Sequence, residues 1–416
     1  FDGAFKSDEL SRFFKIMLLL SAAVTLSLSK AYLERNDLLN FEFSALIVLA
    51  LVGMMMMTSA TNLMSLYVGL ELQALSLYVI ASFRRDNLKS TEAGLKYFVL
   101  GALSSGLLLY GSSLVYGFTG TTSFSGISAV VQLEGVSIGL LLGLVFIIVA
   151  MAFKVSAVPF HMWTPDVYEG SPTPVTAFFS TVPKVAALAM LIRILFDAFG
   201  ASIDQWQQIL MVLAVASMVT GSIAAIGQNN IKRLMAYSSI SHIGFALIGL
   251  AVGNVQGLNA LIIYIVIYVI ANLGVFSFIL CMQKDGVAVT EVPSLSLYSK
   301  TDPLRAFLLS VTILSLAGLP PLVGFLGKLY IFLAAVDSGY AWLAIIGGIS
   351  SVIGAYYYLR IVFLIYFGDS NGGLSGSMPL LNRSILLFSA SIMLLGTFNL
   401  FGFQNISEKI VISFLN

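Results

Sequence analysis

Two lysines inside hydrocarbon-length apolar segments are the residues of this sequence best suited to chemistry. Lys154 precedes an interruption at Val158-Pro159, and Lys184 lies in the apolar segment that resumes after Pro174. A lysine at the centre of a membrane span costs about 2.5–3.5 kcal/mol, so such residues are usually functional or paired. Burial disfavours the charged form and a nearby carboxylate favours it, so a lysine under both influences can exchange its proton. The two lysines therefore predict an ion-translocating path, and a proton path in particular.

Four further polar residues extend this candidate path. Glu71 is a lone carboxylate in an apolar span, and the alternative to a proton-carrying role is an ion pair that only holds helices together. Lys96 lies near the start of a span and can instead extend to the membrane surface. Lys328 follows a second helix break at Gly318 and, near a helix end, can instead extend to the membrane surface. Histidine, the residue type of His242, ordinarily titrates near neutral pH, although a packing role with satisfied hydrogen bonds remains open. The candidate proton relay is Glu71, Lys96, Lys154, Lys184, His242 and Lys328.

Composition sets the class of protein. The chain has 416 residues, of which 58% are hydrophobic and 10% charged, with a mean hydropathy of +0.97. Such a composition predicts a polytopic membrane protein, and the net charge of +1 argues against nucleic acid as a partner. The single cysteine, Cys281, excludes a disulfide framework and a cysteine-held Fe–S cluster within this chain. The two histidines give no support to a haem site, and no nucleotide-binding glycine motif occurs. We therefore expect no cofactor and no metal in this chain, and any redox chemistry in another subunit.

About twelve transmembrane helices are predicted, since the apolar runs are continuous and lack the two-residue alternation of a β-barrel. They cover approximately residues 11–33, 41–60, 62–83, 93–117, 136–163, 173–198, 206–227, 231–253, 256–282, 303–335, 341–367 and 380–402.

Basic residues concentrate in the loops after odd-numbered spans. These are Arg35, Arg84, Arg85, Lys89, Lys232, Arg233, Lys284 and Lys300. The positive-inside rule then places these loops in the cytoplasm or mitochondrial matrix, and both ends of the chain on the opposite side.

The two helix breaks indicate an internal repeat. The first break, at Pro159, and the second, at Ala317–Pro321, each fall in the fourth helix of a five-helix unit. An odd number of helices per unit makes the two copies inverted, and broken helices at matching positions of inverted halves are typical of transport sites. We predict an N-terminal helix in 1–40, the first repeat in 41–198, the inverted second repeat in 199–367, and a C-terminal transmembrane helix and tail in 368–416.

Several motifs resemble subunit N of proton-pumping NADH:quinone oxidoreductase, which is subunit 2 of mitochondrial respiratory complex I. The resemblance covers nearly the whole chain. Its motifs are Val68-Gly-Leu-Glu-Leu-Gln-Ala-Leu-Ser-Leu-Tyr78, Thr91-Glu-Ala-Gly-Leu-Lys-Tyr-Phe98, Phe153-Lys-Val-Ser-Ala-Val-Pro-Phe-His-Met-Trp163, Ile231-Lys-Arg-Leu-Met-Ala-Tyr-Ser-Ser-Ile-Ser-His242 and Gly318-Leu-Pro-Pro-Leu-Val-Gly-Phe-Leu-Gly-Lys328.

The resemblance implies an antiporter-like membrane-arm subunit and a role for each candidate residue. Glu71 would pair with the central lysine, Lys184, and Lys154 would lie on the first broken helix. Lys328 would face the exit on the second broken helix, and the remaining two candidates, Lys96 and His242, would bridge between them. Bacterial family members usually have two further N-terminal helices, so we expect that the family's first two helices are absent from this sequence.

The resemblance also implies partners and a membrane. The chain would be an obligate hetero-oligomer with other antiporter-like and small helical membrane-arm subunits, embedded in lipid of the bacterial or mitochondrial inner membrane. FMN, Fe–S clusters and quinone would be bound by partner subunits, so the chain would be part of an enzyme without a redox centre of its own. Two alternatives remain: a subunit of a multisubunit Na⁺/H⁺ antiporter, and a structural spacer of the membrane arm.

Overall fold

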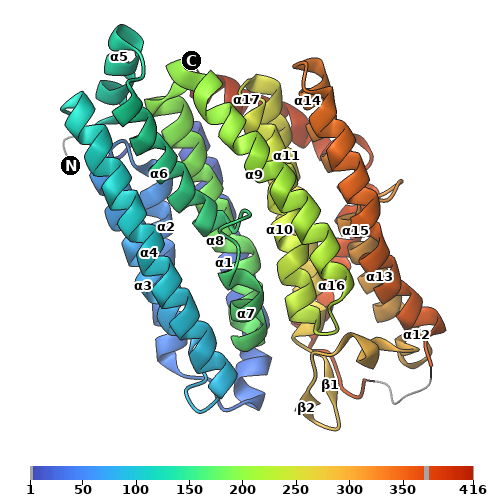
Figure 1. The fold of residues 1–416 in the computed structure, drawn as a ribbon. Coiled ribbons are helices and arrows are strands. Elements are labelled where there is room, and N and C mark those ends of the chain that lie inside the picture. Colours follow the sequence, from blue (N-terminus) through green and yellow to red (C-terminus); the bar gives the residue numbers. More distant parts are fainter. Residues whose placement is uncertain (1–2, 370–373, 416) are drawn as a thin grey trace.

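The structure is a bundle of long helices that lie side by side with their axes approximately parallel (Figure 1). It is a computed structural model, and it describes residues 3–369 and 374–415. The long helices are α1 (Glu9–Arg35), α2 (Phe41–Ser59), α3 (Leu63–Ala81), α4 (Leu88–Thr119), α6 (Ile138–Val155), α8 (Thr173–Arg193), α9 (Ile203–Ile226), α10 (Ile231–Ala251), α11 (Val255–Ile279), α13 (Pro303–Ala317), α14 (Val323–Asp337), α15 (Ala341–Phe367) and α16 (Leu380–Leu395).

Length and hydropathy make this a multi-pass membrane protein. Within the described residues, ten helices are long and apolar enough to cross a membrane. The pair α13 and α14, which is interrupted by a break, lies at the predicted tenth span, and helix α16 lies at the predicted twelfth. The fold class is therefore confirmed as all-α and polytopic, with broken helices.

Both predicted helix breaks are present. Helix α6 ends at Val155, and the short helix α7 (Trp163–Gly170) follows it; helix α13 ends at Ala317, and α14 follows at Val323. The residue after each first segment, Ser156 or Gly318, has a left-handed backbone conformation, with φ of 67° and 82°. This conformation commonly terminates helices, because it turns the chain away from the helix axis. The repeat boundaries at residues 198 and 367 stay a prediction.

Asparagine residues fix where several spans begin. The side chains of Asn62, Asn87, Asn230 and Asn254 each accept a hydrogen bond from a backbone N–H in the first turn of α3, α4, α10 and α11. Such caps satisfy N–H groups that the helix itself leaves free, which matters at a membrane boundary.

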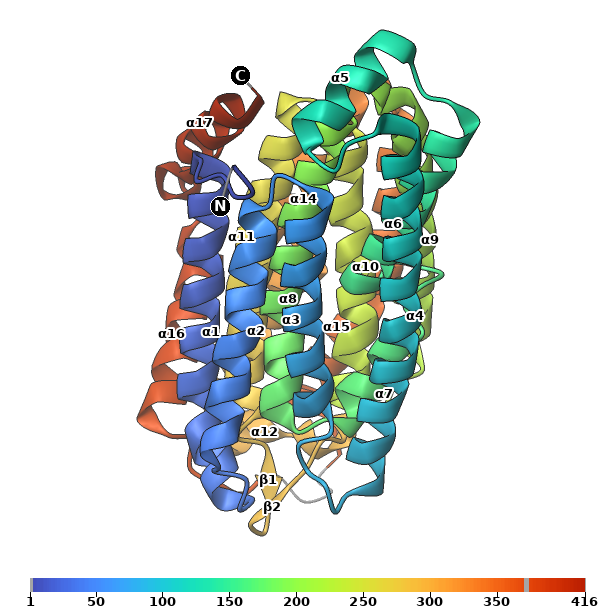
Figure 2. The same cartoon turned by 90° about the vertical axis from the view of Figure 1, so that its left-hand side faces the viewer.

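Smaller elements lie at the two ends of the bundle. The helices α5 (Phe124–Glu134) and α17 (Phe403–Leu415) lie at one end, with the two ends of the chain (Figure 2). The hairpin β1 (Gln283–Lys284) and β2 (Val287–Ala288) and helix α12 (Tyr298–Thr301) lie at the other. The hairpin contains Lys284 and α12 contains Lys300, two of the lysines in the predicted basic loops. These loops and the chain ends therefore lie at opposite ends of the bundle, as predicted.

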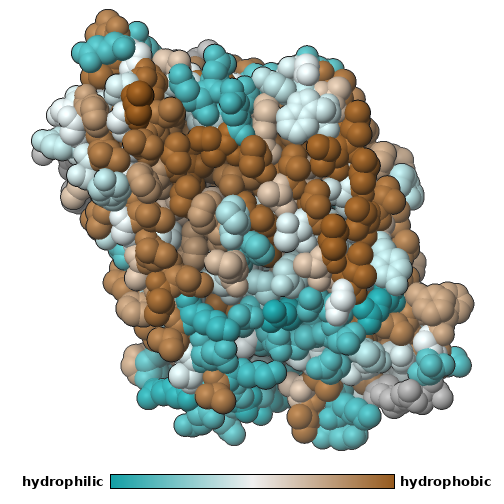
Figure 3. All heavy atoms as spheres, viewed as in Figure 1, coloured by the Kyte–Doolittle hydropathy of each residue, from teal (hydrophilic) through white to brown (hydrophobic). Residues whose placement is uncertain are grey.

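Helix α8 is the buried axis of the bundle. Every residue from Thr173 to Arg193 is buried, and α10 and α11, which pack against it, are buried along most of their length. Helices α4 and α15 are peripheral and largely exposed, and a broad apolar belt covers the surface between two more polar ends (Figure 3). The helices that carry Lys184 and His242 are therefore the ones most shielded from lipid.

A buried arginine ties several helices together at the chain-end side of the bundle. Arg193, at the end of α8, is 1% exposed and donates to the Thr58 carbonyl at 2.6 Å. Its guanidinium also forms ion pairs with Asp8 at 2.5 Å and with Asp197 at 3.1 Å. Burial by itself would raise the pKa of the Asp8 carboxyl, but hydrogen bonds from Arg193 and Ser11 outweigh burial and lower it.

Candidate functional site

Lys154 lies in the last turn of α6, directly before the first break, and is 6% exposed. Its ammonium group is 3.5 Å from the Tyr78 hydroxyl and 5.7 Å from the centre of the Phe153 ring. The carbonyl end of a helix carries a partial negative charge, so the break places Lys154 where the α6 dipole stabilises a cation. Glu71, on α3, is close enough to Lys154 to interact with its charge.

Glu71 does not pair with Lys184, and the expectation of that ion pair is wrong. Lys184 instead donates to the Ser239 hydroxyl on α10. One carboxylate oxygen of Glu71 is buried without a hydrogen bond, and the charge of Glu71 acts on Lys154. The physical reason is the position of the helices: Lys184 points from α8 toward α10, whereas Lys154 and Tyr78 lie on the α3 side.

Lys184 is 2% exposed and lies among hydroxyl groups and aromatic rings. Its ammonium group is 5.6 Å from the centre of the Tyr168 ring. Ser239, which accepts from Lys184, is 2.7 Å from the Tyr268 hydroxyl, which in turn donates to the Ser180 carbonyl at 3.1 Å. Lys184 of α8, Ser239 of α10 and Tyr268 of α11 are thus joined by a continuous series of hydrogen bonds.

A proline in α8 explains why α7 can donate a hydrogen bond to it. Pro183 has no N–H, so within α8 it cannot donate to the carbonyl of Phe179. The Tyr168 hydroxyl of α7 donates to that Phe179 carbonyl instead, at 3.0 Å. The carbonyl that Pro183 leaves free therefore binds the Tyr168 hydroxyl and so positions the Tyr168 ring beside Lys184.

His242 is buried between two tyrosines. Its Nδ1 is 2.5 Å from the Tyr264 hydroxyl on α11, and its Nε2 is 3.0 Å from the Tyr358 hydroxyl on α15. The Tyr358 hydroxyl is also 2.5 Å from that of Ser238. A tyrosine hydroxyl can both donate and accept, so both neutral tautomers of the imidazole can be satisfied here. His242 is therefore held in a place where a change of its protonated nitrogen leaves no partner unsatisfied.

Lys328, on α14, bonds back across the second helix break to the end of α13. Its ammonium group donates to the Ala317 carbonyl and to the Ser351 hydroxyl, both at 2.8 Å, and lies 4.8 Å from the centre of the Phe245 ring. Ala317 is the last residue of α13, so its carbonyl is one of those that the helix leaves free. Lys154 and Lys328 thus both lie at the negative end of a broken helix.

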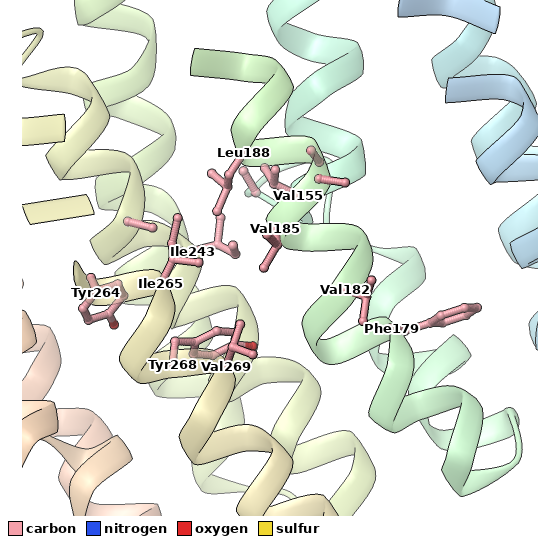
Figure 4. Close-up of a cluster of buried hydrophobic side chains, with 14 of the residues drawn as sticks. Val155, Phe179, Val182, Val185, Leu188, Ile243, Tyr264, Ile265, Tyr268 and Val269 are labelled. Atoms are coloured by element: carbon pink, nitrogen blue, oxygen red, sulfur yellow. The ribbon is translucent and has the colours of Figure 1, made fainter. Parts of the chain in front are cut away.

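A small cavity separates Lys184 from His242. It is lined by both residues and by Val185, Leu188, Ile243, Ala246, Tyr264, Ile265 and Tyr268. The apolar members of this lining project between α8, α10 and α11 (Figure 4). The cavity volume is about 10 Å³, which is approximately the room that one water molecule needs. The charges of Lys184 and Lys328 both act on His242.

Lys96 lies apart from these buried groups. Its side chain is 41% exposed and forms ion pairs with Glu92 at 2.7 Å and with Asp166 at 2.8 Å. This environment agrees with the alternative in which Lys96 extends to the membrane surface. The described residues contain no group of three or more His, Cys, Asp or Glu side chains that could hold a metal ion.

This chain has relatives of known family over nearly all of its length. Residues 60–354 match the family described as NADH:quinone oxidoreductase/Mrp antiporter. NADH-quinone oxidoreductase subunit N of Rhodobacter capsulatus is 56% identical over 416 residues, which are 100% of this chain and 87% of that protein. The same subunit of Jannaschia sp. is 58% identical over 412 residues, 98% of this chain and 85% of that protein. The chain belongs to the subunit N family of NADH-quinone oxidoreductases.

Solved structures extend the comparison beyond this subunit N family. A chain of respiratory complex I from Thermus thermophilus is 34% identical, with a TM-score of 0.82, and the match covers 95% of this chain and 86% of that chain. A chain of the Mrp complex from Dietzia sp. is 21% identical, with a TM-score of 0.84, and the match covers 99% of this chain and 84% of that chain. The second likeness shows a shared fold only.

In this subunit N family member, hydroxyl groups are the functional candidates that sequence reasoning missed. Ser239, Tyr264, Tyr268 and Tyr358 connect Lys184 and His242 to their surroundings. The available signal was the pair Tyr264 and Tyr268, four residues apart in an apolar span and thus on one face of a helix.

Proposed function

We propose that this subunit N family member is a proton-translocating subunit in the membrane arm of an NADH-quinone oxidoreductase. The observation that carries the proposal is the set of buried groups Lys154, Lys184, His242 and Lys328, each of which contacts a hydroxyl group of another helix. An ion pair that only joined helices would satisfy its charges directly, because unpaired buried charge is costly. Here each of the three lysines instead contacts a neutral hydroxyl, which can pass a proton on.

In this mechanism, electrostatics moves the proton. A change in the assembly alters the interaction between Glu71 and Lys154, and a proton then passes by way of Lys184 and His242 to Lys328 and out. Moving one charge against 100 mV costs about 2.3 kcal/mol. A one-unit change in a pKa is worth about 1.36 kcal/mol. Two or three units of change along the path therefore suffice to drive a proton across an energised membrane.

The proposal includes partners and an orientation. The name of the subunit N relatives supports assembly with NADH-oxidising subunits, and the complex I structure supports an obligate hetero-oligomer with other membrane subunits. In this proposal FMN, Fe–S clusters and quinone are bound by those partners. The basic loops face the cytoplasm or matrix, so protons are taken up on their side of the bundle and released on the side of the chain ends.

The test is the variant Lys184→Ala in the assembled complex, reconstituted into vesicles. We expect fewer protons translocated per NADH oxidised, because the middle of the path is removed. The matched control is Lys30→Ala, an exposed lysine of α1 whose partner is Glu34 at 3.9 Å, and it should translocate protons as the wild type does. Normal proton translocation by an assembled Lys184→Ala complex would refute the proposal and favour a structural spacer.

The second candidate is a subunit of a multisubunit Na⁺/H⁺ antiporter, favoured by the matching family, whose description includes the Mrp antiporter. Partners distinguish the two. Purification of the native assembly with NADH-oxidising subunits supports the oxidoreductase, whereas purification with membrane subunits alone, and Na⁺-dependent proton movement, supports the antiporter.

A further inference from the structure

Lys232 is a buried lysine outside the path described above. It lies in the first turn of α10 and is 6% exposed, and its ammonium group makes one hydrogen bond, to the Ser171 carbonyl at 2.8 Å. Two charged side chains of opposite sign, Glu169 and Lys89, act on this ammonium group. A buried lysine, unlike an arginine, can act as a base, so Lys232 can both accept and release a proton.

A charged surface cavity lies beside Lys232, between α4, α7 and α10. The cavity has a volume of about 120 Å³. Its lining residues are Lys89, Glu92, Ala93, Lys96, Asp166, Glu169, Gly170 and Arg233. Arg233, next in sequence to Lys232, pairs with Asp166 at 2.6 Å and with Glu169 at 3.2 Å. Because Glu169 lines the cavity and also acts on Lys232, it joins the solvent-facing groups to the buried lysine.

Buried hydroxyl groups continue inward from Lys232. The Ser171 hydroxyl is completely buried and has no hydrogen-bond partner among the described residues, so it is free to accept or donate. Ser239 lies seven residues after Lys232, on the same face of α10, so the two positions are about 10 Å apart along the helix. The Tyr168 hydroxyl is within reach of Ser239, and Ser239 accepts from Lys184. A distance of about 10 Å is bridged by about three or four hydrogen-bonded steps.

We propose that Lys232 is a proton-carrying residue that takes protons from the charged cavity of Asp166 and Glu169 and delivers them to Lys184 by way of Ser171 and Ser239. The inference rests on the proposed function, since it adds the uptake side to that path. The proton is accepted by the neutral amine of Lys232 from the cavity and released inward, so that the lysine returns to its starting state.

The test replaces Lys232 by residues that keep its hydrogen bond and lose its titration. Lys232→Arg retains a charged donor toward Ser171, but arginine does not release its proton in proteins. The measurement is protons translocated per NADH oxidised by the assembled complex in vesicles. We expect Lys232→Arg to fall to the level of Lys184→Ala. The matched control Lys30→Arg, an exposed lysine of α1 that lies outside this cavity and is paired with Glu34, should equal the wild type.

The outcomes separate this inference from the proposed function. If Lys184→Ala lowers proton translocation and Lys232→Arg does not, the role of Lys232 is overturned and the proposed function stands. If neither variant lowers it, the proposed function itself fails. Where the arginine variant does not assemble, Lys232→Gln, a neutral donor that cannot titrate, carries the same expectation, and normal translocation by it overturns the role of Lys232.

Discussion

Replacing Gly318 by alanine should displace the Lys328 side chain from the second helix break. Gly318 has a φ of 82°, and a Cβ there would lie 2.8 Å from Cδ and 3.0 Å from Nζ of Lys328. The left-handed conformation costs a non-glycine residue about 1–2 kcal/mol. Displacing the lysine also weakens its bond to the Ala317 carbonyl, and a hydrogen bond to a charged group contributes about 1.5–3 kcal/mol. The total expected loss is therefore about 2.5–5 kcal/mol.

The chain offers a matched control for the backbone cost. Gly339 has a φ of 87° and open space where its Cβ would be, so Gly339→Ala meets the same conformational cost without touching a lysine. Thermal unfolding of the assembled complex and proton translocation in vesicles should be measured for both variants. We expect Gly318→Ala to be less stable than Gly339→Ala and to translocate fewer protons per NADH. Equal translocation by the two variants would refute the role assigned to the contact between Gly318 and Lys328.

Two further substitutions test the contacts that position the site. Tyr168→Phe leaves the Phe179 carbonyl of α8 without its donor and should destabilise the subunit by about 1–3 kcal/mol in thermal unfolding, whereas Tyr110→Phe, at an exposed ring, should not. Asp8→Asn removes a charge from buried Arg193 and should lower the unfolding midpoint at neutral pH. Because the Asp8 pKa is lowered in the folded state, its contribution exists above the ordinary value of 3.8 and disappears as pH falls through the lowered pKa. The midpoints of wild type and Asp8→Asn should therefore converge in acid, and a difference that grows there would contradict this account.

The spans and their breaks followed from sequence because they depend on local patterns. Continuous apolar runs predict helices in lipid, and proline or glycine at Pro159 and Gly318 marks where helices stop. The amphipathic helix α5 and the helical tail α17 were not predicted, since neither is a continuous apolar span. Helix α17 packs against α11 and α1, and α5 packs against α4, and a hydropathy window does not register such contacts.

The contacts of the site depended on which helix faces which. Lys154, Lys184, His242 and Lys328 were predicted, because a titratable group in an apolar run is conspicuous by itself. The partner of Glu71 was wrongly assigned, since the rotation of α3 and α8 about their own axes decides it and no local pattern encodes that rotation. The tyrosine hydroxyls around His242 were missed for a related reason: tyrosine in a membrane span is common, and its polar atom becomes informative only beside a partner.

The central claim is that buried lysines hand on protons, and Lys328→Arg tests it most directly. Arginine keeps the positive charge at the carbonyl end of α13 but does not release its proton. The measurement is protons translocated per NADH oxidised by the assembled complex, with the exposed Lys300→Arg as control. The account predicts that Lys328→Arg translocates fewer protons while Lys300→Arg equals the wild type. Full translocation by Lys328→Arg would contradict it.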